Sequence, residues 1–143
     1  MFFFRVEHKS AICEFLAKYT NISIGRGPWS VPFCFTEEEQ YRLAELSVNH
    51  ALPFKSRDFV FDEEINKIVC NSPTDKNVKE HFVFGCERNN LINKYFPSNI
   101  RNLLRSKDFH VKIYGSDNVF VSKFQAVMDI SKPFSVIGSM ELV

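Results

Sequence analysis

The sequence predicts an α+β fold in a single domain, residues 1–143, with a mostly antiparallel β-sheet, continuous or split, packed helices and a C-terminal β-hairpin. Three observations support this prediction. The chain has 143 residues, of which 45% are hydrophobic and 24% are charged, and this suits one domain with one core. Apolar and polar residues alternate near both ends of the chain, as in half-buried strands, and apolar residues recur at helical spacing in between. Strands on either side of a group of helices are typical of α+β proteins.

The first 32 residues are expected to form a strand, a short helix and a loop. Residues 2–7 alternate between two faces and predict an opening strand. Residues 10–19 carry apolar side chains at helical spacing behind Ser10, which predicts a short amphipathic helix that Ser10 caps. Residues 21–32 are interrupted by Gly and Pro and read as a loop, which contains the only tryptophan, Trp29.

A helix is predicted to begin after Thr36. Thr36 and Glu39 match a capping box, and three consecutive glutamates lie where the helix dipole favours negative charge. The apolar pattern continues to about His50, and the helix is expected to end before Pro53.

The middle of the chain predicts shorter elements. In chain order they are a helical turn capped by Asp62, a polar turn at 71–77, a strand at 78–84, a helix at 86–95, and, after Pro97, a helix at 99–106 capped by Ser98.

The last third of the chain returns to strand periodicity. Residues 109–114 and 120–130 alternate on either side of a Gly115–Asn118 turn and predict a β-hairpin, and residues 134–142 predict one more strand. We expect the first strand to join this hairpin in one sheet.

Composition narrows the function and the location. Lys plus Arg is 18 against 17 for Asp plus Glu, so no overall excess of positive charge is present to hold a nucleic acid. The apolar start, residues 1–4, is far too short for a signal peptide or a membrane span, which predicts a cytoplasmic protein with reduced thiols and no membrane partner. The four cysteines and four histidines show no metal-ligand spacing, so we expect no metal.

A resemblance to a known group of proteins rests on short motifs spread over most of the chain. These are Phe4-Arg5-Val6-Glu7-His8, Gly27-Pro28-Trp29, Val83-Phe84-Gly85-Cys86, and Val111-Lys112-Ile113-Tyr114 followed by Gln125. They resemble a family of small bacterial and phage proteins whose order of elements is similar to the ADP-ribosyltransferase-like fold. The resemblance implies a split β-sheet that holds NAD in a cleft.

The resemblance also implies site residues. Arg5 or His8 matches the first-strand position that binds the dinucleotide, and Gln125 matches a polar position on a later strand. The chain departs from the pattern because it has no Ser-Thr-Ser on the strand from Val78 and no Glu within two residues of Gln125. Asp129, four residues further and on the same face by the strand period, is the candidate carboxylate. We therefore expect slow or absent turnover of bound NAD.

Two other sequence features have two interpretations each. The stretch from Gly25 to Trp29 is either a phosphate-cradling loop, with Arg26 and Trp29 at the nucleotide, or a simple turn anchored by a packed Trp. The basic stretch Lys94, Arg101, Arg105 and Lys107 is either a track for a phosphate backbone or, as we expect, a solvated helix face.

The sequence is consistent with two candidate functions. The first is a nucleotide-directed or NAD-directed protein of the ADP-ribosyltransferase-like kind, encoded by a phage or mobile element and directed at a host or defence pathway. The second is a phage-type interaction or inhibitor protein without enzymatic activity, which binds a host protein through surplus aromatic residues, since the chain has 16 Phe.

Overall fold

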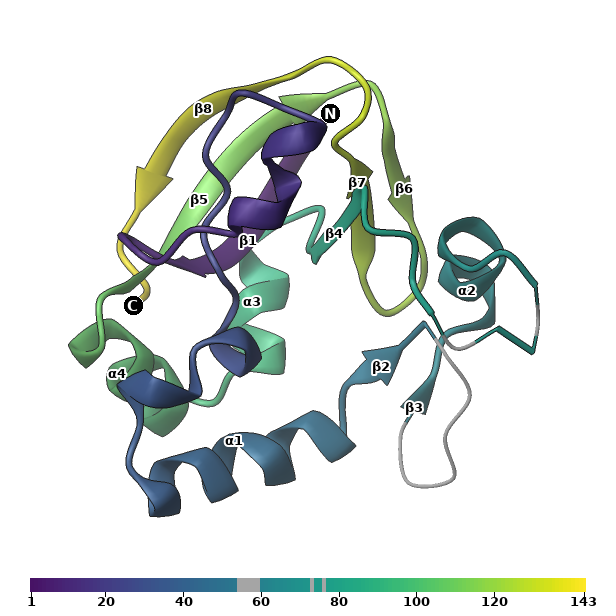
Figure 1. The fold of residues 1–143 in the computed structure, drawn as a ribbon. Helices are drawn as coiled ribbons and strands as arrows, with labels where there is room; N and C mark the ends of the chain where they lie inside the picture. Colours follow the sequence, from purple (N-terminus) through teal and green to yellow (C-terminus); the bar gives the residue numbers. More distant parts are fainter. Residues whose placement is uncertain (54–59, 73, 76) are drawn as a thin grey trace.

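The computed structural model describes residues 1–53, 60–72, 74–75 and 77–143, and the predicted α+β fold with antiparallel sheets is confirmed. The β-sheet is split into two three-stranded parts, with helices packed around them (Figure 1).

The first sheet joins the two ends of the chain. It consists of β1 (Phe2–His8), β5 (Phe109–Ser116) and β8 (Phe134–Met140) in the order β1-β5-β8, and all its neighbours are antiparallel. The first strand therefore lies in a sheet with residues 109–116, as predicted. A register shift beside Ile113 and Tyr114 leaves Ile137 without a partner in β5, which makes a bulge in β8.

The second sheet contains β4 (Phe82–Gly85), β7 (Ala126–Asp129) and β6 (Val119–Val121) in the order β4-β7-β6. The C-terminal hairpin is formed by β6 and β7, while residues 109–114, which the sequence pattern assigned to that hairpin, pair with β1 and β8 instead. The pairing differs because β5 fills the position between the two terminal strands, a contact between distant segments that a local alternation pattern does not encode.

Two of the predicted helix starts are confirmed in atomic detail. Helix α1 (Glu37–Val48) begins with a full capping box, in which the Glu39 amide donates to Thr36 Oγ1 at 3.2 Å and the Thr36 amide donates to Glu39 Oε1 at 2.9 Å. Helix α2 (Glu63–Val69) begins after Asp62, whose Oδ1 accepts from the Ile65 amide at 3.1 Å.

Two other capping predictions are wrong. Helix α4 (Ser98–Ser106) follows α3 (Asn89–Tyr95), but Pro97 holds the cap position and Ser98 is already helical. The helix predicted at residues 10–19 is only a 3₁₀ turn, Glu14–Lys18. Ser10 does not cap it, because the turn begins only after Cys13, and Ser10 Oγ lies 3.3 Å from His8 Nδ1 instead.

The two faces of the first sheet are covered by different segments. Helices α3 and α4 pack on one face, around a cluster that includes Val6, Ile92, Leu104, Phe109 and Val111. The segment from Cys13 to Ile24 packs on the other face, around a second cluster that includes Phe3, Leu16, Ile24, Tyr114 and Met128. These two layers hold β1 in the centre of the molecule.

The remaining elements lie at one end of the molecule. Strands β2 (Ala51–Leu52) and β3 (Val60–Phe61) form a short parallel pair.

The polar turn predicted at 71–77 includes residues 73 and 76, which lie outside the described residues. Among the four cysteines, Cys70 and Cys86 are buried, Cys13 and Cys34 are half-buried, and all are unpaired. No helix in the described part of the chain is long and apolar enough to cross a bilayer.

Candidate functional site

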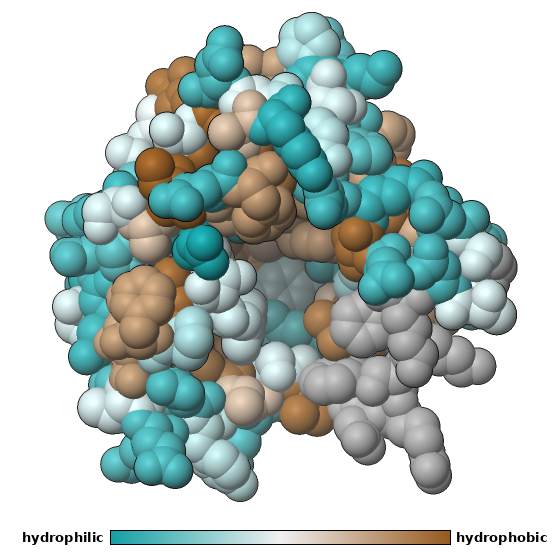
Figure 2. Space-filling model, in the orientation of Figure 1, coloured by the Kyte–Doolittle hydropathy of each residue, from teal (hydrophilic) through white to brown (hydrophobic). Residues whose placement is uncertain are grey.

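The candidate site is a cavity of about 290 Å³ at the seam between the two sheets, which we call the seam pocket. Figure 2 shows the corresponding hollow near the middle of the face that Figure 1 displays. It is lined by segments from most of the chain: Phe4, Arg5, Val6, Gly27, Pro28, Trp29, Ser30, His50, Ala51, Phe84, Gly85, Cys86, Ile92, Tyr95, Phe96 and Gln125.

The floor of the seam pocket is the junction of β1 and β4. The backbones of Phe4 and Cys86 exchange two hydrogen bonds of 2.8 Å, which join the two sheets through a single bridge. Gly85 makes this approach feasible, because a Cβ there would lie 2.5 Å from the Phe4 carbonyl oxygen and 2.7 Å from the Phe3 ring. Any side chain at position 85 would therefore push the sheets apart.

An aromatic wall closes one side of the pocket. Trp29 stacks on Phe96 with ring centroids 5.8 Å apart, and its indole nitrogen donates to the Leu43 carbonyl at 2.9 Å. His50 contacts Trp29, Tyr95 and Phe96 edge-on at 5.2 to 5.5 Å, and its Nε2 lies 3.0 Å from the Tyr95 carbonyl oxygen. The wall is therefore held in place by hydrogen bonds as well as by packing.

The polar groups of the wall are uncharged at neutral pH. Burial lowers the pKa of His50 below its ordinary value, against the opposing effect of its bond to the Tyr95 carbonyl. Burial raises the pKa of Tyr95 to about 12, with smaller contributions from Cys86 and Asp62, and it also raises the pKa of the Cys86 thiol to about 12. The thiol is thus protonated and a poor nucleophile.

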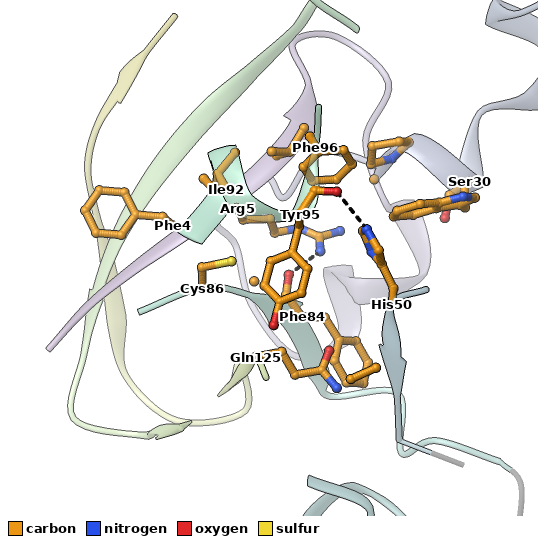
Figure 3. A pocket seen from close by; sticks show the side chains of 16 residues that line it. Phe4, Arg5, Ser30, His50, Phe84, Cys86, Ile92, Tyr95, Phe96 and Gln125 are labelled. Carbon is orange, nitrogen blue, oxygen red and sulfur yellow. Dashed lines mark hydrogen bonds between the residues drawn. The ribbon is translucent and has the colours of Figure 1, made fainter. Parts of the chain in front are cut away.

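Among the described residues, Arg5 is the one charged residue that lines the pocket, and much of its guanidinium is already engaged. Its Nη1 donates to the Phe84 carbonyl at 2.8 Å, and its Nη2 donates to the Gly25 carbonyl at 3.2 Å. Its Nε lies 3.3 Å from Glu7 Oε2. Arg5 therefore ties β1 to β4 and to the loop after Ile24 while it faces the cavity (Figure 3).

Glu7 is a buried carboxylate that the sequence reasoning did not assign to the site. Its side chain is 1% exposed, and it accepts hydrogen bonds from the Gly25 amide at 3.1 Å and from the Tyr114 hydroxyl at 3.0 Å. Lys112 Nζ lies 3.5 Å from Oε1 of the same carboxylate. Glu7 shares one face of the alternating first strand with Phe3 and Arg5, and the alternation alone gives no sign that this carboxylate is buried.

Gln125 lines the pocket from the turn between β6 and β7. Its amide nitrogen donates to Asp62 Oδ2 at 3.2 Å, and Ser122 Oγ donates to the same oxygen at 2.6 Å. The Tyr95 ring projects across the pocket with its hydroxyl end toward Gln125 (Figure 3). The prediction that Gln125 lies on a strand is wrong, because β7 begins one residue later.

The structure brings together three of the six predicted site residues, since Arg5, Trp29 and Gln125 all line the seam pocket. The other three are used elsewhere. His8 Nδ1 accepts from the Ala11 amide at 2.9 Å, Arg26 Nε donates to the Ile12 carbonyl at 3.0 Å, and Asp129 Oδ1 accepts from Ser131 Oγ at 2.6 Å.

The position of Asp129 differs from the prediction for a simple reason. The strand period placed Asp129 on the same face as Gln125, but Gln125 precedes the strand and Asp129 ends it, beside Phe82. The pattern missed His50 and Tyr95. Tyr95 is the last residue of the helix predicted at 86–95, where apolar residues at helical spacing indicate packing, and His50 has a predicted role only at the end of the preceding helix. In the described part of the chain, no three His, Cys, Asp or Glu side chains form a metal-binding group.

These features define a small α+β protein with a split antiparallel sheet and an aromatic, largely uncharged pocket at its seam. A family model described as Bacteriophage T4 Y00F protein matches residues 1–142, and the chain belongs to this family. No curated protein and no solved structure matches it. The phage part of the sequence resemblance is confirmed, and the ADP-ribosyltransferase part stays a prediction.

Proposed function

We propose that this member of a phage protein family is a nucleotide-directed protein of the ADP-ribosyltransferase-like kind, which binds NAD or a related nucleotide in the seam pocket and acts on a host or defence pathway. The main support for the proposal is the position of the pocket in the fold. It lies at the seam of a split sheet, where the resemblance puts the dinucleotide, and both Arg5 and Gln125 line it.

The aromatic wall favours the ring end of such a ligand. Trp29, His50, Tyr95 and Phe96 already contact one another at aromatic distances, and a planar base or nicotinamide ring adds favourably to such an arrangement. The uncharged state of His50 and Tyr95 suits a neutral ring such as adenine or free nicotinamide.

Two polar groups are placed to orient that ring. The Gln125 amide can donate to and accept from a carboxamide or the edge of a base, and the Tyr95 hydroxyl lies on the same side of the pocket. Arg5 has five N–H groups, and its contacts to Phe84, Gly25 and Glu7 leave about two of them for a ligand oxygen.

The size of the cavity sets how much of a ligand it holds. Its volume of about 290 Å³ lies at the lower end of the range for pockets that enclose a drug-sized molecule. We therefore infer that the pocket takes one ring-bearing end of the nucleotide and that the diphosphate lies at its mouth.

Transferase chemistry would need a carboxylate beside the ribose as nicotinamide leaves. Among the described residues no Asp or Glu lines the seam pocket, and the nearby Glu7 carboxylate is occupied by Arg5, Tyr114 and Lys112. The proposal is therefore binding with slow or absent turnover.

Calorimetric titration with nicotinamide, NAD, ADP-ribose and adenosine tests the proposal. We expect heat of binding for at least one ligand, and we expect Trp29→Ala to remove it, because this change deletes the stacked ring of the wall. Phe33→Ala is the matched control, since Phe33 is 77% exposed and outside the pocket lining. No heat with any of the four ligands, or equal loss in both variants, would contradict the proposal.

Exposed aromatic residues favour a second candidate, a phage-type interaction protein that inhibits a host protein. Phe2, Phe15, Phe33 and Tyr41 all expose more than half of their surface, and exposed aromatic side chains are common anchors at interfaces. Retention of a host protein by the wild-type chain and by Trp29→Ala, together with its loss in Phe33→Ala, would support this candidate over nucleotide binding.

A further inference from the structure

Strand β8 leaves an open edge on the first sheet. It lies at the end of the order β1-β5-β8, and in the described part of the chain it pairs only with β5 (Figure 1). Within the described residues, no backbone hydrogen bond joins residues 134–140 to any other segment. Such an edge presents unpaired N–H and C=O groups to a second extended chain.

The edge lacks charge and is partly apolar. Residues 134–140 include no charged residue and no Pro, which are the usual means of blocking strand addition. Val136 is 43% exposed and Ile137 is 53% exposed. They lie on opposite faces of the sheet, because Val136 pairs with Tyr114 while Ile137 lies over Gly115, the next residue of β5.

The bulge at Ile137 divides β8 into two equal halves. A bulge can twist an edge away from pairing, but this one lies at the centre of the strand and leaves residues 134–136 and 138–140 on its two sides. In an antiparallel pair of two β8 strands whose two-fold axis lies between Val136 and Ile137, each half faces the other half of the second copy, so that Phe134 faces Ser139 and Ser135 faces Gly138.

The charges that flank β8 are complementary to a second copy in this arrangement. Exposed Lys132 precedes the strand and exposed Glu141 follows it. They are separated by about 30 Å along an extended strand, so they cannot pair within one chain. An antiparallel arrangement puts Lys132 of each copy beside Glu141 of the other, whereas a parallel arrangement puts like charges together.

We propose that β8 is a self-association edge, through which two copies of this chain form one continuous sheet in the order β1-β5-β8-β8-β5-β1. Two ion pairs between Lys132 and Glu141 set its direction. The exposed Val136 and Ile137 side chains become covered, while the seam pocket, at the other end of each half sheet, stays open. The association is therefore independent of any nucleotide.

A charge swap tests the direction of pairing. Sedimentation over a wide concentration range is expected to show a reversible dimer for the wild-type chain. Lys132→Glu and Glu141→Lys should each weaken it about tenfold, because each change turns both attractive pairs into repulsive ones. The double variant restores opposite charges and should return to within about threefold of the wild-type affinity.

A second pair of variants tests the edge itself. Val136→Lys on β8 should abolish the dimer, while Val121→Lys is the matched control on β6, the edge strand of the other sheet. If Val136→Lys does not fold, the charge swap alone decides. A wild-type chain that is monomeric at every concentration, a double variant as weak as the single ones, or an equal effect of Val121→Lys would overturn the proposal.

Discussion

Replacing Tyr114 by Phe isolates the contribution of one buried hydroxyl to the network beneath the pocket. The Tyr114 hydroxyl donates to both oxygens of Glu7 at 3.0 Å, and both side chains are almost fully buried. Phe has the same shape without the hydroxyl, so no cavity of note is created. Water cannot easily replace the lost donor, because the site is closed to solvent.

The magnitude follows from the partners that remain. A hydrogen bond to a charged group contributes about 1.5 to 3 kcal/mol to stability, and Glu7 keeps the Gly25 amide, Arg5 and Lys112 after the change. We therefore expect Tyr114→Phe to lower the free energy of unfolding by about 1.5 to 3 kcal/mol. With a urea slope of about 2 kcal/mol/M, the midpoint of unfolding should fall by about 1 M.

Urea denaturation followed by circular dichroism measures this effect, with Tyr41→Phe as the control. Tyr41 is exposed, so its variant should stay within about 0.5 kcal/mol of the wild-type chain. A double-mutant cycle with Glu7→Gln separates the pairwise interaction from other effects of each change. A loss below about 0.5 kcal/mol in Tyr114→Phe would refute the view that the hydroxyl holds the buried carboxylate.

Four further predictions concern the first helix, the pocket and pH. Thr36→Ala should cost about 0.5 to 2 kcal/mol in urea denaturation and leave ligand affinity unchanged, because the capping box lies outside the pocket. Gln125→Ala should weaken the binding of any ligand found by calorimetry by about 0.5 to 1.5 kcal/mol, the net value of one neutral hydrogen bond, and unchanged affinity would remove Gln125 from the site. Arg5→Lys should lower the free energy of unfolding by about 1 to 3 kcal/mol, because an ammonium group cannot reach Phe84, Gly25 and Glu7 together, and a stability equal to that of the wild-type chain would contradict this role. The pKa of His50 is lowered in the folded state, so the unfolded chain takes up a proton near pH 6.5 that the folded chain does not. The free energy of unfolding should therefore fall as the pH drops below about 6.5, and it should fall less steeply in His50→Gln. An equal dependence on pH in the wild-type chain and in His50→Gln would contradict this prediction.

Local patterns in the sequence predicted the elements that local contacts build. Thr36 and Glu39 satisfy each other's backbone amides within four residues, and the Asp62 side chain accepts from the Ile65 amide at the start of the next helix, so both starts can be read from the chain. Ser10 has the right residue type for a cap, but its side chain lies against His8 and the helical turn begins only after Cys13. The partner of β5 depends on which distant strands meet it, and no spacing along the chain records that choice.

The candidate site, like the fold, could be predicted only in part from the sequence. Arg5, Trp29 and Gln125 were singled out by residue type and motif, and all three line the pocket. His50 and Tyr95 join them only because α1 and α3 end beside each other, where the imidazole meets the Tyr95 carbonyl. An apolar face at helical spacing does not reveal which of its aromatic residues borders a cavity.

The position of the only tryptophan has a spectroscopic consequence. Trp29 is 43% exposed and stacks on Phe96 in the wall of the seam pocket. The indole fluorescence of the whole protein therefore originates at the pocket, and Tyr95, one of the four tyrosines, lines the same cavity. The unlabelled chain thus contains an intrinsic optical probe whose emission depends on the polarity of the seam pocket. No second indole contributes to the signal.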